Sequence, residues 1–361
     1  MDKNTLYKKM TEMVPVKSDD GDFRMLVKTQ LNSYIQLLEE LEEDDRPDDW
    51  SSIVARVTQL CGGLNRAINS EYKGMRHSAY NAIKHQLDGY KNQKVEISGL
   101  AIDANIQDLH SGTVFYRMRK VALEEQKKIK RGDLFHIPLD KRGLVETQRY
   151  SVPGYPCLYL SHRVYGCWEE MNRPDFGTVM VSKFQSQADL RVLDIRMPSK
   201  MLWDNDWIKC VKYFPFVIAS MVQVKNNKDS YKPEYLIPQL LTEWVIAHNR
   251  EFTDKSDEII GIMYTSSQKN DDFDYPEESY DNLAIPVLSP LSSGKYCKRL
   301  KELFKLSKPT YYDLEVLKHG EGLNAGRFDL TEEEQREENI NLSHFGCMED
   351  YLNLAKLEFV E

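Results

Sequence analysis

Two adjacent carboxylates, Glu169 and Glu170, are well placed in this sequence to take part in chemistry. They follow a short, apolar, β-prone stretch at 157–160 and lie on a helix-like run that ends at Met171. Successive side chains on a helix point about 100° apart, so only one of the two carboxylates can face a given cleft. Tyrosines and Arg149 flank this region, which favours a polar site over a plain surface.

Further polar residues lie on or next to other apolar segments. Arg117 and Arg119 would share one face of a β-like segment over 113–122, since side chains alternate along a strand. Two arginines side by side need an anion or carboxylates nearby, unless the segment is an edge strand whose charges oppose aggregation. Ser266 ends another candidate for a buried strand, over 259–266. Each residue alone also has a structural explanation, so the case for a site depends on the set.

Several common catalytic motifs are missing from the sequence. No G-x-G-x-x-G follows a strand, and Gly294-Lys295 lacks the upstream glycine and downstream Ser or Thr of a P-loop. There is no H-E-x-x-H, no paired His/Cys spacing and no G-x-S-x-G, so we predict no metal site. The six cysteines form no C-x-x-C pair, which favours buried thiols in a reducing cytoplasm. A hydrolase of the serine, zinc or P-loop type would therefore be unconventional.

The composition indicates a folded protein. A length of 361 residues, at roughly 150 residues per domain, predicts about two domains or one large domain with an appendage. The net charge of −9 argues against a general nucleic-acid binder. No run approaches the roughly 20 apolar residues of a membrane span, and residues 1–9 contain no apolar signal core. We expect a cytoplasmic protein with neither a nucleic-acid nor a membrane partner.

Helical periodicity dominates the first part of the chain. Residues 1–23 are polar and predict a loose lead-in. Apolar residues then recur at helical spacing over 23–43, 51–70 and 75–90. Together these segments predict a small helical domain over residues 1–100.

Short strands and helices alternate irregularly in the next part, which predicts an α+β domain over 110–290 rather than a doubly wound one. The strand candidates are 113–122, 157–160, 178–184, 190–195, 259–266 and 282–287, and the helix candidates lie within 197–224 and 235–248. A partly helical C-terminal extension is expected over 291–361. In it, a capping box at 331–334 would open a helix over 332–340, and 344–361 would be helical.

Four segments are arranged in an order that resembles a known family. The segments are Phe115-Tyr-Arg117, Gln148-Arg-Tyr-Ser-Val-Pro-Gly-x-Pro-x-Leu-Tyr-Leu160, Trp168-Glu-Glu170 and Gly261-Ile-Met-Tyr-Thr-Ser266. Their order is similar to that of the RES domain family, which is named for an Arg, a Glu and a Ser. The resemblance covers about residues 113–290 and leaves the first 100 residues outside it.

The resemblance implies an ADP-ribosyltransferase-like fold with mixed or antiparallel sheets. It also implies a toxin or defence effector that degrades NAD at the nicotinamide–ribose bond, as a glycohydrolase or phosphorylase. NAD would be the substrate, with no separate cofactor, and a cognate antitoxin could be the protein partner. Two alternatives stay open: ADP-ribosyl transfer to a macromolecule, and a non-catalytic protein that binds a partner through its helical N-terminal region.

The resemblance also implies roles for individual residues. Arg117, Glu170 and Ser266 fall on the three motif positions, and the residues expected to bind NAD are Arg149, Tyr150, Tyr159 and Arg119. A carboxylate beside the ribose can stabilise the positive charge that develops as the bond breaks. Arginines can hold the pyrophosphate, and a tyrosine can stack on a ring.

The chain departs from the family pattern at two positions near this site. Ser151 stands where the family commonly has Asn, and Arg163 stands where a small residue is more usual. Glu169 and Ser267 are neighbouring alternatives to the assigned Glu and Ser.

Overall fold

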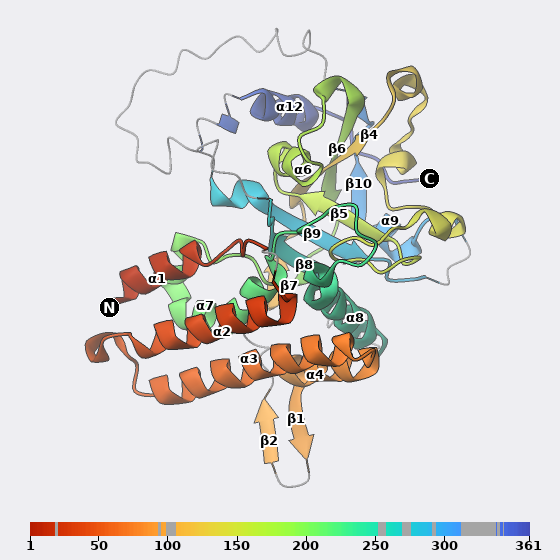
Figure 1. The fold of residues 1–361 in the computed structure, drawn as a ribbon. Helices are drawn as coiled ribbons and strands as arrows, with labels where there is room; N and C mark the ends of the chain where they lie inside the picture. The colour runs from red at the N-terminus through yellow and green to blue at the C-terminus, as the bar shows by residue number, and fades with distance from the viewer. Residues whose placement is uncertain are drawn as a thin grey trace, which may run out of the picture. The chain divides into compact units, whose positions relative to one another are not determined.

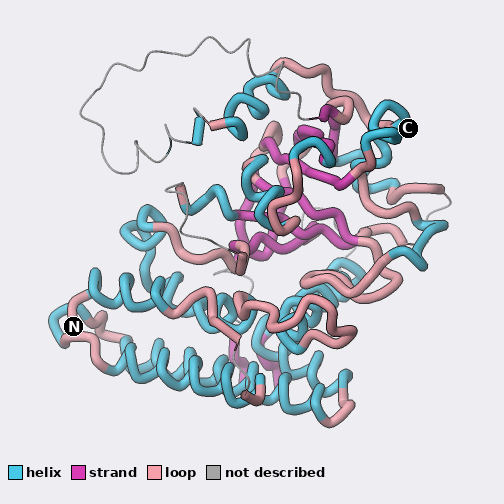
Figure 2. Tube along the Cα trace, turned by 45° about the horizontal axis from the view of Figure 1, so that its top comes forward, coloured by secondary structure: helices cyan, strands magenta, loops and turns pink. Residues whose placement is uncertain are grey.

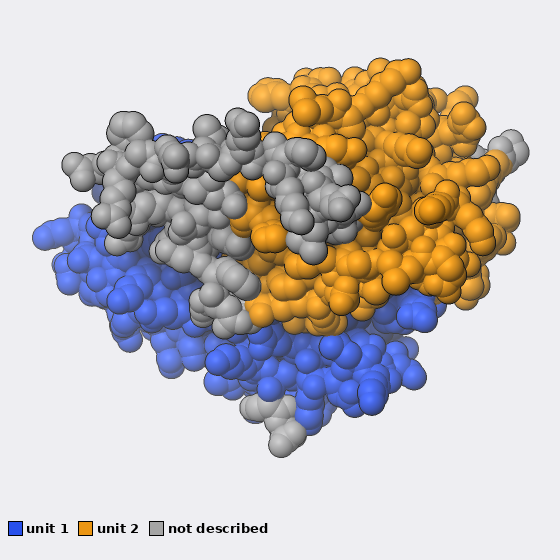
Figure 3. Space-filling view, turned by 90° about the horizontal axis from the view of Figure 1, so that it is seen from above, with its two compact units in different colours: residues 1–107, 146–153, 191–267 blue, residues 108–145, 154–190, 268–361 orange. Residues whose placement is uncertain are grey.

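The chain folds as two compact units, each assembled from segments that are distant in the sequence (Figure 3). Unit 1 contains residues 1–107, 146–153 and 191–267, and unit 2 contains 108–145, 154–190 and 268–361. This computed structural model describes residues 1–18, 21–92, 95–98, 106–251, 258–268, 276–290, 294–311, 337, 340–341 and 343–361. The predicted capping box at 331–334 and most of the helix expected over 332–340 lie outside these residues.

Unit 1 is largely helical. Its described helices are α1 (Lys3–Glu12), α2 (Phe23–Glu39), α3 (Trp50–Tyr72), α4 (Arg76–Asp88), α7 (Lys200–Ser220) and α8 (Leu236–Glu251). Helices α2 and α3 lie side by side (Figure 1) and bury the apolar stripes that predicted them, among them Val27 and Leu31 on α2 and Val57 and Leu64 on α3. These stripes recur at a spacing of three or four residues, so a single helix face can be buried.

The loose lead-in predicted for residues 1–23 is wrong, because this segment contains helix α1. The Asp2 side chain accepts a hydrogen bond from the Thr5 amide and caps the helix. Leu6 and Met10, one helical turn apart, are buried. The Tyr7 ring also packs against Trp203, with centroids 5.3 Å apart, so α1 is held by few contacts that the polar sequence does not reveal.

Two strand pairs accompany the helices of unit 1. Most of β7 (Leu190–Asp194) belongs to this unit and pairs in parallel with β8 (Ile259–Thr265), whose seven residues are all buried. Strands β1 (Gly89–Asn92) and β2 (Val95–Ser98) form an antiparallel hairpin. Strand β3 (Ile106–Leu109) spans the boundary between the units in the sequence.

Unit 2 contains an antiparallel ladder in the order β10-β6-β4-β5-β9, with β11 also paired to β6. Figure 2 shows strands of the structure in magenta and its helices in cyan. The strands are β4 (Val114–Lys120), β5 (Cys157–Ser161), β6 (Val179–Ser186), β9 (Asp281–Pro286), β10 (Phe304–Leu306) and β11 (Thr310–Tyr311). Strand β5 is central, as its short apolar sequence predicts. Helices α6 (Val164–Glu170), α9 (Lys298–Leu303) and α12 (His344–Asn353) complete the unit.

The architecture confirms the α+β expectation, since a parallel pair, an antiparallel ladder and several helices all occur. The helix expected over 344–361 ends at Asn353, so the prediction is wrong for its last residues. There the Glu358 backbone exchanges two hydrogen bonds with Leu306, which requires extended chain. Of the helices that the structure describes, none is long and apolar enough to cross a bilayer.

A proline inside α7 explains a buried hydrogen bond of unit 1. Pro215 has no N–H, so the Val211 carbonyl one turn earlier cannot make its usual helical bond. The hydroxyl of Tyr34, a fully buried residue of α2, donates to that carbonyl at 2.8 Å. Tyr34 therefore replaces the backbone donor that the helix lacks.

Tyr34→Phe should lower the free energy of unfolding by about 2 kcal/mol, because it leaves a buried carbonyl without a donor. Urea unfolding followed by circular dichroism measures the change. Pro215→Ala is the matched background: it restores the N–H, so Tyr34→Phe should cost much less there. Equal costs in both backgrounds would show that Tyr34 does not replace the missing bond.

Candidate functional site

The helix that presents the two glutamates is short and is closed sharply at its C-terminal end. Asn172 and Arg173 both adopt left-handed backbone, with φ of 56° and 51°. Their amides donate to the Glu169 carbonyl at 2.9 Å and the Trp168 carbonyl at 3.0 Å. These bonds satisfy carbonyls at the end of α6, although a non-glycine residue adopts this conformation at a cost. The turn brings the Arg173 side chain back over the helix.

Glu169 is held inside unit 2. Only 3% of the residue is exposed, and its carboxylate accepts a hydrogen bond from the Tyr165 hydroxyl at 2.5 Å. Arg173 donates to the same carboxylate through Nη2 at 2.9 Å and Nε at 3.1 Å, and its guanidinium lies 5.5 Å from the centre of the Trp168 ring. An ionised carboxylate buried without such partners would cost several kcal/mol. This pairing therefore allows the Glu169 side of α6 to point inward.

Glu170, the next residue, is exposed on the same helix. Asn282 holds it: the buried amide on β9 donates from Nδ2 to the Glu170 Oε1 at 3.1 Å. The same Nδ2 donates to the Tyr280 carbonyl at 3.1 Å, which orients the amide. Asn282 was not predicted as a site residue, and a polar residue in a buried strand is the signal that could have identified it.

Arg117 on β4 is a partly buried cation with few partners. Its Nη1 donates to the Tyr159 carbonyl of β5 at 2.9 Å. The Nε is buried and has no hydrogen-bond partner, and no ion pair joins Arg117 to a carboxylate, among the residues that the structure describes. Burial lowers the pKa of the guanidinium, which still remains protonated. The guanidinium of Arg117 therefore keeps one buried donor that no described residue uses.

Cys167 is a buried thiol on α6, between strand β4 and Glu170 in its contacts. Burial raises the pKa of this thiol to about 12, and the nearby charges of Arg117 and Glu170 lower and raise it, respectively. Cys167 precedes Glu170 by one helical turn on α6, and its Sγ donates to the Tyr116 carbonyl of β4 at 3.3 Å. Three of the predicted residues, Arg117, Tyr159 and Glu170, thus belong to unit 2, and a hydrogen bond joins Arg117 to Tyr159. Arg119 lies apart, exposed, and donates to the Asp133 carbonyl at 2.8 Å.

The remaining predicted residues belong to unit 1. The Arg149 guanidinium donates to the carbonyls of Ser220 at 2.8 Å and Val222 at 3.1 Å, and to the Ser267 hydroxyl at 2.7 Å. It also lies 5.1 Å from the centre of the Tyr235 ring. Ser220 ends α7, where a cation is favourable because the helix dipole is negative. These contacts give Arg149 a structural role within unit 1.

Tyr150 and Ser266 are buried in the same unit. The Tyr150 ring packs against Tyr264 with centroids 4.3 Å apart, and the Thr242 hydroxyl donates to the Tyr150 carbonyl at 3.0 Å. The serine that Arg149 contacts is therefore Ser267, the neighbouring alternative, rather than Ser266.

Unit 2 also contains a cavity of about 510 Å³, which is lined by residues other than the predicted site residues. Lys130, Arg131, Lys295, Tyr296 and Lys308 contribute to its wall, and Arg131 is paired with Glu358 at 2.8 Å. None of the predicted site residues lines it.

Comparison with known proteins identifies a relative but no family model. The chain is 33% identical over 316 residues to a protein of Bacillus subtilis (strain 168) named "Putative toxin YopC". The alignment covers 83% of this chain and 68% of that protein. No protein-family model matches the sequence. No solved structure matches it either.

Removing the two glutamate charges one at a time should separate their roles. Glu169→Gln should lower the free energy of unfolding by about 2 kcal/mol, because the buried bonds to Arg173 and Tyr165 are disturbed. Glu170→Gln should change it by less than about 0.5 kcal/mol, as is usual for exposed positions. Thermal and urea unfolding measure both, and equal losses would contradict the assignment of an inner and an outer glutamate.

Arg117→Met should leave the free energy of unfolding unchanged or raise it by about 1 kcal/mol, because the substitution replaces a poorly paired buried charge by an apolar chain. Arg149→Met is the matched control. It should cost about 2 kcal/mol, since three hydrogen bonds to Arg149 are lost. Strong destabilisation by Arg117→Met would show that Arg117 has a structural role.

Proposed function

Since the chain belongs to the family of the "Putative toxin YopC", we propose that it is a toxin that degrades NAD by cleaving the nicotinamide–ribose bond. The observation that best supports the choice of site is the division between neighbouring glutamates. Glu169 is buried with Arg173, whereas Glu170 is exposed and oriented by Asn282. A carboxylate that is both exposed and oriented is what a reaction through a cationic sugar requires.

The proposed chemistry is the departure of nicotinamide from the ribose. The bond between C1′ and the pyridinium nitrogen breaks, and its electron pair stays with nicotinamide. Positive charge then develops on the ribose, where the Glu170 carboxylate stabilises it and holds a ribose hydroxyl. An oxygen of the acceptor bonds to C1′, and the proton that this oxygen carried is released to the solvent. Water would give ADP-ribose and phosphate would give ADP-ribose phosphate.

Arg117 supplies a second element of the proposal. Its guanidinium has an unused buried donor among the described residues, and a pyrophosphate is an anion that such a donor can bind. Tyr159 neighbours it on β5 and is proposed to contact the substrate. NAD contacts by Arg119, Arg149, Tyr150 and Ser266 rest on the resemblance to the RES family alone.

The proposal has consequences for location and partner. Unpaired cysteines indicate a reducing cytoplasm, which we take as the place of action. A toxin that consumes NAD in its own cell needs an inhibitor, so a cognate antitoxin is included in the proposal.

Purified protein incubated with NAD should release nicotinamide. Glu170→Gln should lower kcat by about 10²- to 10³-fold, as expected when one group that stabilises a transition-state charge is removed. Arg117→Met should raise KM about tenfold, because binding energy to the phosphates is lost. Chromatography of nicotinamide and the ADP-ribose product measures both effects, and Glu124→Gln, at an exposed position, is the control that should keep full activity.

Product identity distinguishes the alternatives. Free ADP-ribose indicates hydrolysis, and a phosphate-dependent product indicates phosphorolysis. Label from the adenine half of NAD on a macromolecule would instead support ADP-ribosyl transfer. Absence of NAD loss under all three conditions, or full activity of Glu170→Gln, would remove the proposed role of Glu170.

A further inference from the structure

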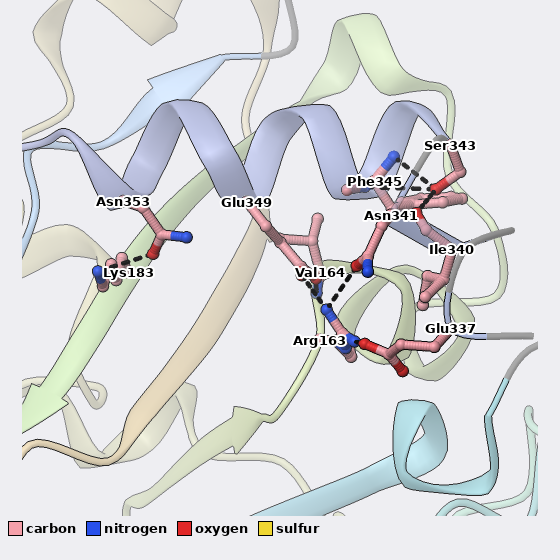
Figure 4. Close-up of polar contacts among 11 residues, drawn as sticks. Arg163, Val164, Lys183, Glu337, Ile340, Asn341, Ser343, Phe345, Glu349 and Asn353 are labelled. Carbon is pink, nitrogen blue, oxygen red and sulfur yellow. Dashed lines mark hydrogen bonds and ion pairs between the residues drawn. The ribbon is translucent and has the colours of Figure 1, made fainter. Parts of the chain in front are cut away.

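Arg163, the residue that departs from the RES pattern, connects helix α6 to the C-terminal extension (Figure 4). It immediately precedes α6, and its Nη1 forms an ion pair with the Glu349 Oε2 of α12 at 2.8 Å. Its Nη2 pairs with Glu337, and Nη1 also reaches the Asn341 side chain at 3.4 Å. One side chain thus joins the start of α6 to three residues more than 170 positions later in the sequence.

Glu349 also caps α6 directly. Its second carboxylate oxygen, Oε1, accepts a hydrogen bond from the Val164 amide at 2.7 Å. Val164 begins the helix, and a helix cannot satisfy its first amides internally. The N-cap residue, Arg163, makes no side-chain capping bond of its own. A distant carboxylate therefore supplies the cap, at the helix end where negative charge is favoured.

The burial of Glu349 indicates that this contact is tightly constrained. The residue is 4% exposed, and burial raises the pKa of its carboxyl group although Arg163 opposes the shift. A buried carboxylate is costly unless it is paired and hydrogen-bonded, and here Arg163 and the Val164 amide provide both. Without Arg163, the buried Glu349 carboxylate would be poorly satisfied. Without Glu349, the Val164 amide and the Arg163 guanidinium would be poorly satisfied.

Apolar packing places α12 against the same helix. Tyr165 and Trp168 of α6 have ring centroids 5.2 Å and 5.3 Å from that of Phe345. At the far end of α12, Asn353 accepts a hydrogen bond from the Lys183 Nζ of β6 at 2.8 Å, so the helix is fixed at both ends (Figure 4). Helix α6 has only seven residues, and an isolated helix of that length is not stable. Its rotation must therefore be set by its neighbours.

We propose that Glu349 is a positioning residue, which acts with Arg163 to fix α6 in the rotation that buries Glu169 and presents Glu170. The inference depends on the proposed function of Glu170 for its catalytic consequence, but not for its structural one. It also gives the C-terminal extension, which lies outside the RES resemblance, a role in the site.

Two variants of Glu349 and one control test this role in the full-length chain. Glu349→Gln keeps the side-chain volume and an oxygen for the Val164 amide, but loses the ion pair. Glu349→Ala loses both. Glu337→Ala removes the more exposed partner of the same arginine and should behave like the unmodified protein.

Hydrogen–deuterium exchange is the first measurement. We expect amides over 164–171 to exchange about tenfold faster in Glu349→Ala and by a smaller factor in Glu349→Gln, because exchange reports local opening. Amides of α2 and α3 should be unchanged. Unaltered exchange over 164–171 in a folded Glu349→Ala or Glu349→Gln variant would overturn the inference. If Glu349→Ala does not fold, Glu349→Gln decides alone.

NAD turnover, measured well below the unfolding temperature, is the second measurement. Misplacement of a reacting group lowers turnover, so kcat should fall by up to about 100-fold in Glu349→Ala. KM should stay within about twofold, because the groups proposed to bind the phosphates are untouched. An unchanged kcat in a variant with faster exchange would contradict the catalytic part of the inference. If the unmodified protein does not consume NAD, the proposed function fails, and the exchange result still decides whether Glu349 positions α6.

Discussion

The buried ion pair between Glu169 and Arg173 is the interaction that allows helix α6 to place a carboxylate inside unit 2. A seven-residue helix has little stability of its own, and a carboxylate placed in an apolar interior without a partner would cost more than the helix could gain. Tyr165 and Arg173 remove that cost, but both lie within four residues of Glu169 and move with the helix. The rotation of α6 is therefore set by contacts from outside it, through Glu349 and Phe345. The exposure of Glu170 follows from this rotation.

Arg117 and Arg149 are two arginines at different positions of the RES resemblance, and their surroundings differ physically. Arg149 donates to two backbone carbonyls at and just beyond the end of α7, and to the hydroxyl of Ser267. Arg117 donates to one carbonyl and keeps a buried Nε without a partner among the described residues. The hydrogen bonds of Arg149 stabilise the fold of unit 1, whereas Arg117 has a donor that contributes no bond to unit 2.

Local sequence patterns predicted most of the elements, because local periodicity determines them. The continuous apolar run of β8 and the helical stripes of α2 and α3 needed no knowledge of the rest of the chain. Helix α1 was missed because only two of its residues, Leu6 and Met10, are buried. The non-helical end of the chain was missed because the pairing of Glu358 with Leu306 joins distant segments.

The site was less predictable for the same reason. The chemistry of Arg117 and Glu170 can be read from residue type and order, but their supporting contacts cannot. Asn282 reaches Glu170 from 112 positions away, and Glu349 reaches the start of α6 from 185 positions away. Arg163 departs from the RES pattern, and its ion pair with Glu349 explains the departure. Glu349 lies in the C-terminal extension, which the RES resemblance does not cover.

The two ends of α6 are attached to different fixed points, Glu349 at Val164 and the left-handed pair Asn172 and Arg173 beyond Glu170. The length of the helix is therefore as constrained as its composition. One inserted residue would rotate everything that follows it by about 100° and carry the wrong glutamate to the surface. Sequence changes therefore cannot lengthen or shorten α6 by single residues without moving Glu170, the one exposed residue of the helix.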